Sequence, residues 1–334
     1  MIDKELYSLT ASEKLCFHAI SPEAFQHPAD KAALEALKKA RGLDWITSKV
    51  MELGLERIIK MRLVADSLRV SPDQCHSLFN TYKETCNVLD IPTVPEFFVS
   101  CDPVPNAYTT GFTHPVVVVT SGLLEIVNDE ELRFILGHEL GHVKCGHVLY
   151  MTMAEYLSEL LEAVGNVTLG IGSYLGKGLE LSFLLWSRKA EFSADRGGLL
   201  ACQNEEAAIK GLMKLAAPID KIWDEISIES ILQQAEEFEE LSDDTLSKVY
   251  KIVFGFQRTH PWLVLRTKET KLWAGSDDYQ NLLQQGISAE EYAQRLTTAH
   301  EPRVFTPQRN FCTECGQPLQ ATDKFCGYCG TRFE

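Results

Sequence analysis

The stretch ILGHELGHVKCGH at residues 135–147 constrains the fold more than any other feature, because it sets three histidines and one glutamate within ten positions. Asn128 lies shortly before it, with Glu131 three residues further on, which is the pattern of a capping box at a helix start. Apolar residues follow at helical spacing from Leu132 to Leu140, and no proline interrupts them. The sequence therefore predicts that these histidines lie on a helix.

The spacing on that helix assigns a role to each side chain. His138 and His142 are one turn apart on one face and can bind a single ion, while Glu139 lies beside them, better placed to hold a water molecule. This His-Glu-x-x-His pattern is typical of two zinc ligands and a general base. His147 falls on roughly the opposite face if the helix continues, so we do not expect it to reach the same ion. The alternative is an ordinary charged helix with two surface histidines.

A catalytic zinc needs a third protein ligand, and residues 184–202 supply a candidate. Glu191 and Asp195 are four residues apart on a predicted helix face that is otherwise small and apolar, where unpaired carboxylates are costly. Glu191 would complete a His-His-Glu site, and Asp195 would accept the other ring N–H of a ligating histidine. The alternative is a surface ion pair between Glu191 and a neighbouring arginine. Gly197 and Gly198 favour close packing of this helix on the histidine-bearing one.

Four blocks in this order resemble the HtpX-like peptidases, relatives of the CAAX prenyl proteases. They are PNAYTTG with the apolar run after it (105–124), HELGH (138–142), SRKAEFSAD (187–195) and THPWLVLR (259–266). The resemblance implies a zincin-type metallopeptidase domain of the gluzincin group. It also implies the role of each site residue: His138, His142 and Glu191 as zinc ligands, Glu139 as general base, Asp195 behind the ligands, and Asn106 and His260 near the bound substrate.

The stretch PNAYTTG is also a candidate for holding substrate. We expect it to form the exposed edge strand of a small sheet beside the zinc helix, to which an extended peptide can add as a further strand. Asn106 would then contribute its side-chain amide to the substrate backbone. The expected donor to the oxyanion is His260, with Tyr108 as the second candidate. The alternatives are a turn role for Asn106 after Pro105 and a capping or space-filling role for His260.

Four of the ten cysteines form two Cys-x-x-Cys-Gly knuckles near the C-terminus, namely Cys312, Cys315, Cys326 and Cys329. Four thiolates on two such knuckles match a closed tetrahedral zinc site. The segment resembles the small zinc ribbons appended to many bacterial proteins. Disulfides are the poorer alternative, because nothing in the sequence indicates secretion. The sequence thus predicts two Zn²⁺ ions, one catalytic and one structural.

The expected fold class is α+β and mostly helical, with a small mixed or antiparallel sheet beside the active-site helix. We predict an N-terminal helical region (1–88), the peptidase domain (89–300), a linker (301–310) and the Cys₄ zinc ribbon (311–334). The segments EFFVS, NAYTT and PVVVV predict three short strands. Helices are predicted at 49–66, at 71–89 with Ser71 as N-cap, at 204–216, 220–238 and 242–254, and from Ser288.

The segment 163–186 is the best candidate for a membrane span, but glycines and charged residues interrupt it. It therefore predicts a Gly-rich loop followed by a short amphipathic helix. The N-terminus is acidic and lacks a hydrophobic signal core. We accordingly expect a cytoplasmic protein without a transmembrane segment.

These features together predict a zinc-dependent endopeptidase that hydrolyses peptide bonds of protein substrates through a zinc-bound water activated by Glu139. The alternative is a non-catalytic metal-binding adaptor that uses the fold and the ribbon for protein–protein interaction. A nucleic-acid partner is not expected, because the formal net charge is −15 and the segment 303–334 has four Lys/Arg against three Asp/Glu. The ribbon could instead dock a protein partner.

Overall fold

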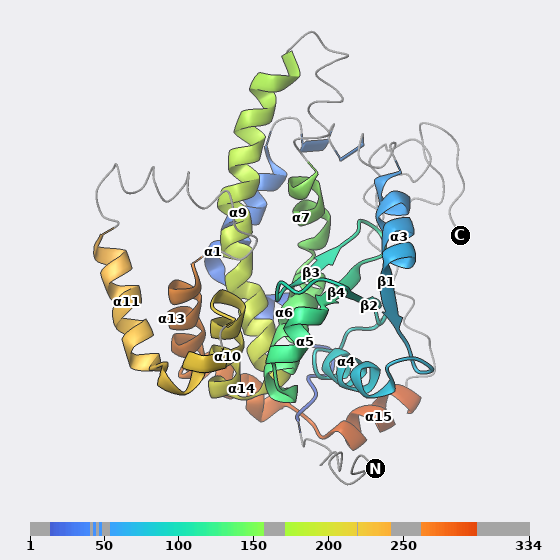
Figure 1. Ribbon diagram of the computed structural model, residues 1–334, viewed down its shortest axis with the longest axis vertical. Coiled ribbons are helices and arrows are strands. Elements are labelled where there is room, and N and C mark those ends of the chain that lie inside the picture. The colour runs from blue at the N-terminus through green and yellow to red at the C-terminus, as the bar shows by residue number, and fades with distance from the viewer. Residues whose placement is uncertain are drawn as a thin grey trace.

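The computed structural model describes residues 14–40, 43–44, 47–48, 54–156, 171–218, 220–241 and 262–298. Two helices lie at its centre: α6 (Asp129–Lys144) carries the histidines, and the long helix α9 (Ile171–Cys202) packs along it (Figure 1). Helix α1 (Pro28–Lys38) contacts α9. A small sheet lies on the other side of α6 (Figure 1). The histidine-bearing helix is thus enclosed between a sheet and a helical layer.

The sheet has four strands in the order β1-β2-β4-β3. Strand β1 (Ser67–Val70) pairs antiparallel with β2 (Glu96–Ser100), which runs parallel to β4 (Val116–Thr120). Strand β3 (Ala107–Thr110) pairs antiparallel with β4 and forms the edge next to α6. Every residue of β4 is buried, as expected for a central strand made almost entirely of valine. The small mixed sheet within a mostly helical chain confirms the predicted fold class.

The prediction of helices throughout residues 1–88 was wrong at β1. Helix α3 (Leu55–Asp66) ends where Ser67 adopts an extended backbone, with φ −132° and ψ 156°. The strand that follows has only four residues, of which only Val70 is fully buried. So short a strand leaves no readable alternation of apolar and polar residues, and its pairing with β2 decides its conformation.

Helix α6 begins as its sequence predicts and ends before His147. The Asn128 side chain accepts a hydrogen bond from Glu131 N at 2.9 Å, and Glu131 Oε2 accepts one from Asn128 N at 2.8 Å. At the other end Gly146 adopts φ +70°, the left-handed conformation that commonly ends a helix. His147 therefore precedes a separate helix, α7 (Val148–Glu155), and does not continue the first one.

The expected short helix within 163–186 is also corrected, because residues from Ile171 onward belong to the long helix α9, while residues 163–170 lie outside the described ranges. Leu179, Phe183 and Trp186 are buried in a core cluster with Leu34 of α1. These residues recur at helical spacing on one buried face of α9, so packing outweighs the low helix propensity of the glycines. Within the described ranges, no helix is long and apolar enough to cross a membrane.

The other described helices are α4 (His76–Val88), α5 (Ser121–Ile126), α10 (Glu205–Ala216), α11 (Ile228–Glu240), α13 (Leu263–Ala274), α14 (Asp277–Gln285) and α15 (Ala289–Thr298), with short 3-10 helices η1 (Pro22–Ala24) and η2 (Asp220–Glu225). Ser71 is not the N-cap of α4, because Ser71 and Gln74 close a tight turn by mutual backbone hydrogen bonds. The predicted helix at 242–254 lies outside the described residues.

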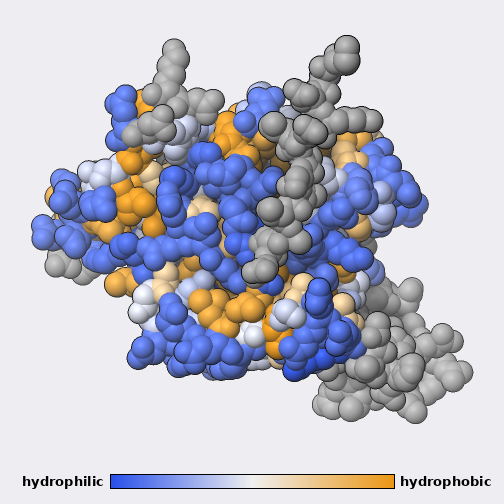
Figure 2. Space-filling view, turned by 90° about the horizontal axis from the view of Figure 1, so that it is seen from below, coloured by the Kyte–Doolittle hydropathy of each residue, from blue (hydrophilic) through white to orange (hydrophobic). Residues whose placement is uncertain are grey.

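Hydrophilic side chains cover most of the face that Figure 2 shows, with apolar side chains gathered in patches between them. The formal net charge of −15 agrees with a surface that is largely hydrated. Among the described residues, the buried apolar side chains form three clusters, and the largest joins α4, α6, the end of α9, α10 and residues from all four strands.

Close packing of α9 on α6 through glycine was predicted and is confirmed. A Cβ added at Gly197 would lie 3.0 Å from Gly141 Cα, and one added at Gly198 would lie 2.7 Å from Phe134 O. Both distances are shorter than a normal contact, so the two backbones approach as closely as they do only because these positions lack a side chain. This approach sets the distance between the histidines of α6 and the carboxylates of α9.

Replacing Gly198 with Ala is therefore expected to destabilise the fold by about 1–3 kcal/mol, because the added methyl group forces the helices apart. The matched control is Gly275→Ala, where the nearest atoms are 3.8 Å from the added Cβ and a change within about 0.5 kcal/mol is expected. Urea denaturation of both variants measures the difference. Equal stability of the two variants would show that the helix approach tolerates a side chain.

Candidate active site

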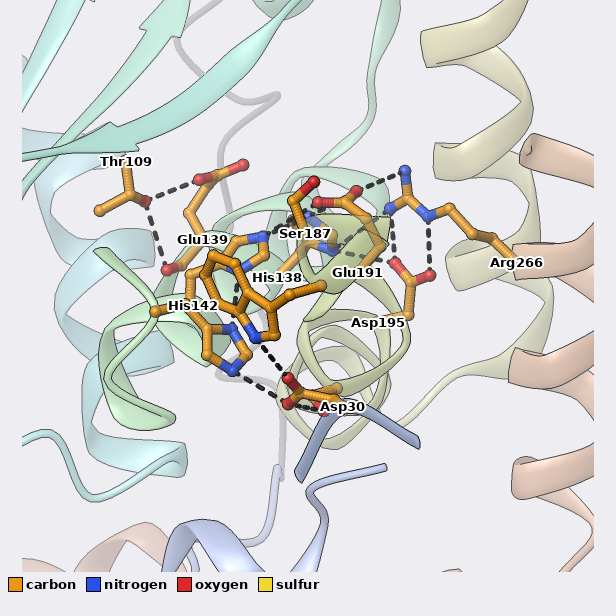
Figure 3. Close-up of polar contacts among 12 residues, drawn as sticks. Asp30, Thr109, His138, Glu139, His142, Ser187, Glu191, Asp195 and Arg266 are labelled. Atoms are coloured by element: carbon orange, nitrogen blue, oxygen red, sulfur yellow. Dashed lines mark hydrogen bonds and ion pairs between the residues drawn. The ribbon is translucent and has the colours of Figure 1, made fainter. Parts of the chain in front are cut away.

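Three side chains from two helices converge at the centre of the molecule. His138 and His142 come from α6 and Glu191 from α9, and all three are buried (Figure 3). The Nε2 atoms of the two histidines lie 3.2 Å apart. Glu191 places Oε1 3.4 Å from His142 Nε2 and Oε2 3.7 Å from His138 Nε2. These residues form a group whose ligand atoms could hold one metal ion.

The separations fit zinc. Tetrahedral zinc with bonds of about 2.0–2.2 Å to nitrogen or oxygen has neighbouring ligand atoms about 3.3–3.6 Å apart. The two shortest separations, 3.2 Å between the Nε2 atoms and 3.4 Å from His142 Nε2 to Glu191 Oε1, lie close to that range. A set of two imidazoles and one carboxylate is also a ligand set that catalytic zinc sites use, with the fourth position open for water or substrate.

Asp195 fixes the protonation of His138. Its Oδ1 lies 2.9 Å from His138 Nδ1, and both side chains are buried. Burial alone would raise the pKa of Asp195, but the charge and hydrogen bonds of Arg266 and the contact with His138 lower it. The carboxylate is therefore ionised and can only accept, so the proton sits on His138 Nδ1. The lone pair on Nε2 then points toward His142 and Glu191.

Arg266 on α13 pairs with both carboxylates and was not identified from the sequence. Its Nε and Nη2 donate to Asp195 at 2.8 and 2.6 Å, and Nη1 lies 3.0 Å from Glu191 Oε2. Burial acts to lower the pKa of this guanidinium, but Asp195 and Glu191 raise it above its ordinary value. The sequence did contain an indication of this residue. Two carboxylates on an apolar helix face require a nearby cation, and Arg266 is the last residue of the block THPWLVLR.

Glu139 lies on the opposite side of the histidines from Arg266, facing β3 (Figure 3). The Thr109 hydroxyl donates to Glu139 Oε2 at 2.6 Å, which holds the carboxylate in one orientation. Glu139 is only 1% exposed and does not belong to the group of potential metal ligands. Thr109 was a second residue that the sequence did not single out, since a threonine in a strand is unremarkable until its neighbour across the fold is known.

His147 lies within the site after all, but behind His142. Because α6 ends before it, the His147 ring turns back and its Nδ1 lies 3.0 Å from His142 Nδ1. The Nε2 of His147 lies 3.0 Å from Oδ2 of Asp30, a residue of α1. His147 is not among the potential metal ligands found within the described residues, and its exclusion from the ion stays a prediction.

The remaining predicted site residues are not all brought together. Asn106 precedes β3, where its backbone exchanges hydrogen bonds with Thr120 at 2.8 and 2.9 Å. Tyr108 alternates with Thr109 along β3 and packs against a core cluster that contains Phe98, so it lies on the sheet face away from Glu139. His260 and the ribbon cysteines Cys312, Cys315, Cys326 and Cys329 lie outside the described residues.

Two histidines one turn apart, a glutamate from a second helix and a buried glutamate beside them form an arrangement typical of metallopeptidases. The sequence profile of peptidase family M48 matches residues 73–274, and that of a zinc-ribbon domain matches residues 311–333. The chain belongs to peptidase family M48, a family of zinc metallopeptidases. This confirms the predicted HtpX-like family and the C-terminal zinc ribbon.

Known relatives support the same family. The chain is 32% identical over 272 residues to the plastoglobule-localized metallopeptidase 48, chloroplastic, of Arabidopsis thaliana, covering 80% of this chain and 77% of the plant protein. It is 30% identical over 175 residues to the protease HtpX homolog 2 of Methanosarcina mazei, covering 46% of this chain and 59% of that protein. A protease HtpX homolog of Moorella thermoacetica is 27% identical over 197 residues, covering 51% and 66% of the two chains.

Proposed function

We propose that this protein is a zinc-dependent endopeptidase in which His138, His142 and Glu191 hold the catalytic zinc and Glu139 is the general base. The observation that carries the proposal is the position of these three side chains. The Nε2 atoms of His138 and His142 lie 3.2 Å apart, and Glu191 Oε1 lies 3.4 Å from His142 Nε2. Zinc bound there would polarise a substrate carbonyl and lower the pKa of water toward about 7. The test is zinc-dependent cleavage of an unfolded protein.

The chain's own residues supply the proton transfers. Glu139 would take the proton of the attacking water and pass it to the leaving amine, as general acid–base catalysis requires of one positioned carboxylate. The hydrogen bond from Thr109 at 2.6 Å supports this role, because it restrains the carboxylate without occupying both of its oxygens. Arg266 would keep Glu191 and Asp195 ionised, so that the ligand and the partner of His138 both retain their charge.

An extended polypeptide is the substrate that the sheet fits best. Strand β3 is the edge of the described sheet and contacts α6, so a peptide added alongside it would pass the histidines. The backbone of Asn106 is fixed by Thr120 at the start of this strand, which supports a role for the Asn106 amide in holding the substrate. Tyr108 faces the core cluster and is better suited to hold the strand in place.

The oxyanion donor proposed from the family resemblance is His260. Replacing His260 with Ala is expected to lower kcat by roughly 10²–10³-fold, because one donor to the developing charge is lost. Replacing Asn106 with Ala should lower kcat/KM more modestly, and both variants should keep the fold and both zinc ions. Steady-state cleavage of a fluorogenic peptide separates the two effects. An unchanged kcat in the His260 variant would reduce this residue to a structural role.

The finer features of the organisation are further proposals. We propose one catalytic zinc and one structural zinc held by Cys312, Cys315, Cys326 and Cys329. The boundaries 1–88, 89–300, 301–310 and 311–334, a cytoplasmic location and a protein partner for the ribbon also stay predictions of the sequence.

A further inference from the structure

We propose that Asp30 and His147 are positioning residues of the catalytic site: Asp30 orients His147, and His147 holds His142 in the tautomer that presents Nε2 to the metal. The inference rests on the proposed function, because it assigns a partner to one of the proposed zinc ligands. It also extends the site beyond residues 73–274, the part of the chain that matches the peptidase family, since Asp30 belongs to helix α1.

Asp30 is the anchor of this arrangement. It is fully buried, and four donors surround it: Trp186 Nε1 at 3.0 Å from Oδ1, and Ser193 Oγ, Gln26 Nε2 and His147 Nε2 at 2.6, 2.9 and 3.0 Å from Oδ2. Burial alone would raise the pKa of Asp30, but His147, Ser193 and Gln26 lower it to about 2. A buried carboxylate saturated with donors remains an acceptor at every pH at which the enzyme would work.

The proton positions follow from that anchor. Because Asp30 can only accept, His147 donates from Nε2, which leaves its Nδ1 as the ring nitrogen that faces His142. The two Nδ1 atoms lie 3.0 Å apart and can share one hydrogen, which His142 donates when its Nε2 binds the metal. The lone pair of His142 is then on Nε2, the atom that lies 3.4 Å from Glu191 Oε1.

His138 is oriented in a similar way, but by direct contact with a carboxylate. Asp195 accepts directly from His138 Nδ1, whereas His142 reaches its carboxylate through a second imidazole. Both histidine ligands would thus be oriented by a buried carboxylate. Groups of this kind typically contribute 10–100-fold to metal affinity. Asp30, although 117 residues away from His147 in the sequence, would do for one ligand what Asp195 does for the other.

The test is zinc affinity of the full chain, measured by competition with a chromophoric chelator that removes only the more labile zinc. Asp30→Asn is expected to weaken binding of that zinc by roughly 10–100-fold, because an amide cannot accept from all four donors. His147→Leu should cause a similar loss, since it removes the acceptor for His142. His147→Gln should restore most of the affinity, because its amide can accept from His142 and donate to Asp30.

Leu34→Ala is the matched structural control. Leu34 lies on α1 and is buried in a core cluster, but it has no part in the hydrogen bonds of Asp30. This variant should lose stability through the cavity it creates and keep the wild-type zinc affinity. If it lost affinity as much as Asp30→Asn does, the effect would belong to the packing of α1, and the proposal would be wrong.

A second measurement needs no variant. Nitrogen-15 NMR of histidine-labelled, zinc-loaded protein should show one ligating histidine whose Nδ1–H is hydrogen-bonded to another imidazole nitrogen.

In the zinc-affinity experiment, a wild-type chain without labile zinc would overturn the proposed function. Labile zinc bound equally tightly by wild type, Asp30→Asn and His147→Leu would overturn only the positioning role.

Discussion

Replacing Glu139 with Gln is expected to lower kcat for cleavage of an unfolded protein by roughly 10²–10⁴-fold, the usual contribution of a general base. The amide has nearly the shape of the carboxylate and can still accept from the Thr109 hydroxyl, which donates at 2.6 Å. It cannot, however, take a proton from water. Because Glu139 lies outside the group of potential metal ligands, the variant should keep its full zinc content.

Casein cleavage and zinc content, both measured on the same preparation, check this prediction. Thr109→Val is the graded control, because it removes the hydrogen bond to Glu139 and leaves the carboxylate itself. Its loss of kcat should be smaller than that of Glu139→Gln. Activity near wild type in the Gln variant would remove Glu139 from the mechanism and favour the non-catalytic adaptor.

Replacing Glu191 with Ala is expected to deplete the labile zinc and abolish cleavage together. The carboxylate is one of three proposed ligands. Removing it should therefore weaken zinc binding by more than the roughly 10–100-fold typical of residues that only hydrogen-bond to a ligand. The substitution also leaves Arg266 without one of its buried acceptors, which lies 3.0 Å away. Some loss of stability should therefore accompany the loss of metal.

Glu131→Ala separates these two effects. Glu131 is 1% exposed, lies on α6 and pairs with the half-buried Lys214 at 2.7 Å, so its removal also breaks an ion pair of a buried carboxylate. It is two turns from His138 and should leave zinc binding intact. Zinc analysis after mild chelation and thermal unfolding of both variants provide the comparison. Retention of labile zinc by Glu191→Ala would require a different third ligand.

Local features of the site could be predicted from the sequence because they depend on spacing within a helix. The capping box at Asn128 and Glu131 fixed where α6 begins, and helical spacing brought His138 and His142 to one face. The Glu191 and Asp195 pair was equally readable, since two carboxylates on an apolar face need an explanation. The glycines of α9 likewise predicted its close approach to α6.

The surroundings of the site could not be read in the same way, because they depend on tertiary contacts. Nothing near Asp30 in the sequence indicates that it meets His147, and the contact exists only because α1 packs on α9. The sequence indicated that Glu191 and Asp195 need a neighbouring cation, but it did not indicate that Arg266 would be that residue. The position of His147 was different: Gly146, a typical residue after a helix end, could have shown that α6 stops there.

The most direct test of the central claim is a zinc titration of the full-length chain after mild chelation. The claim is that one zinc held by His138, His142 and Glu191 hydrolyses peptide bonds. We expect casein cleavage to disappear as the labile zinc is removed and to return as one equivalent rebinds, while the zinc held by the ribbon cysteines is retained throughout. Full cleavage by a chain that retains only the cysteine-bound zinc, or none, would contradict it.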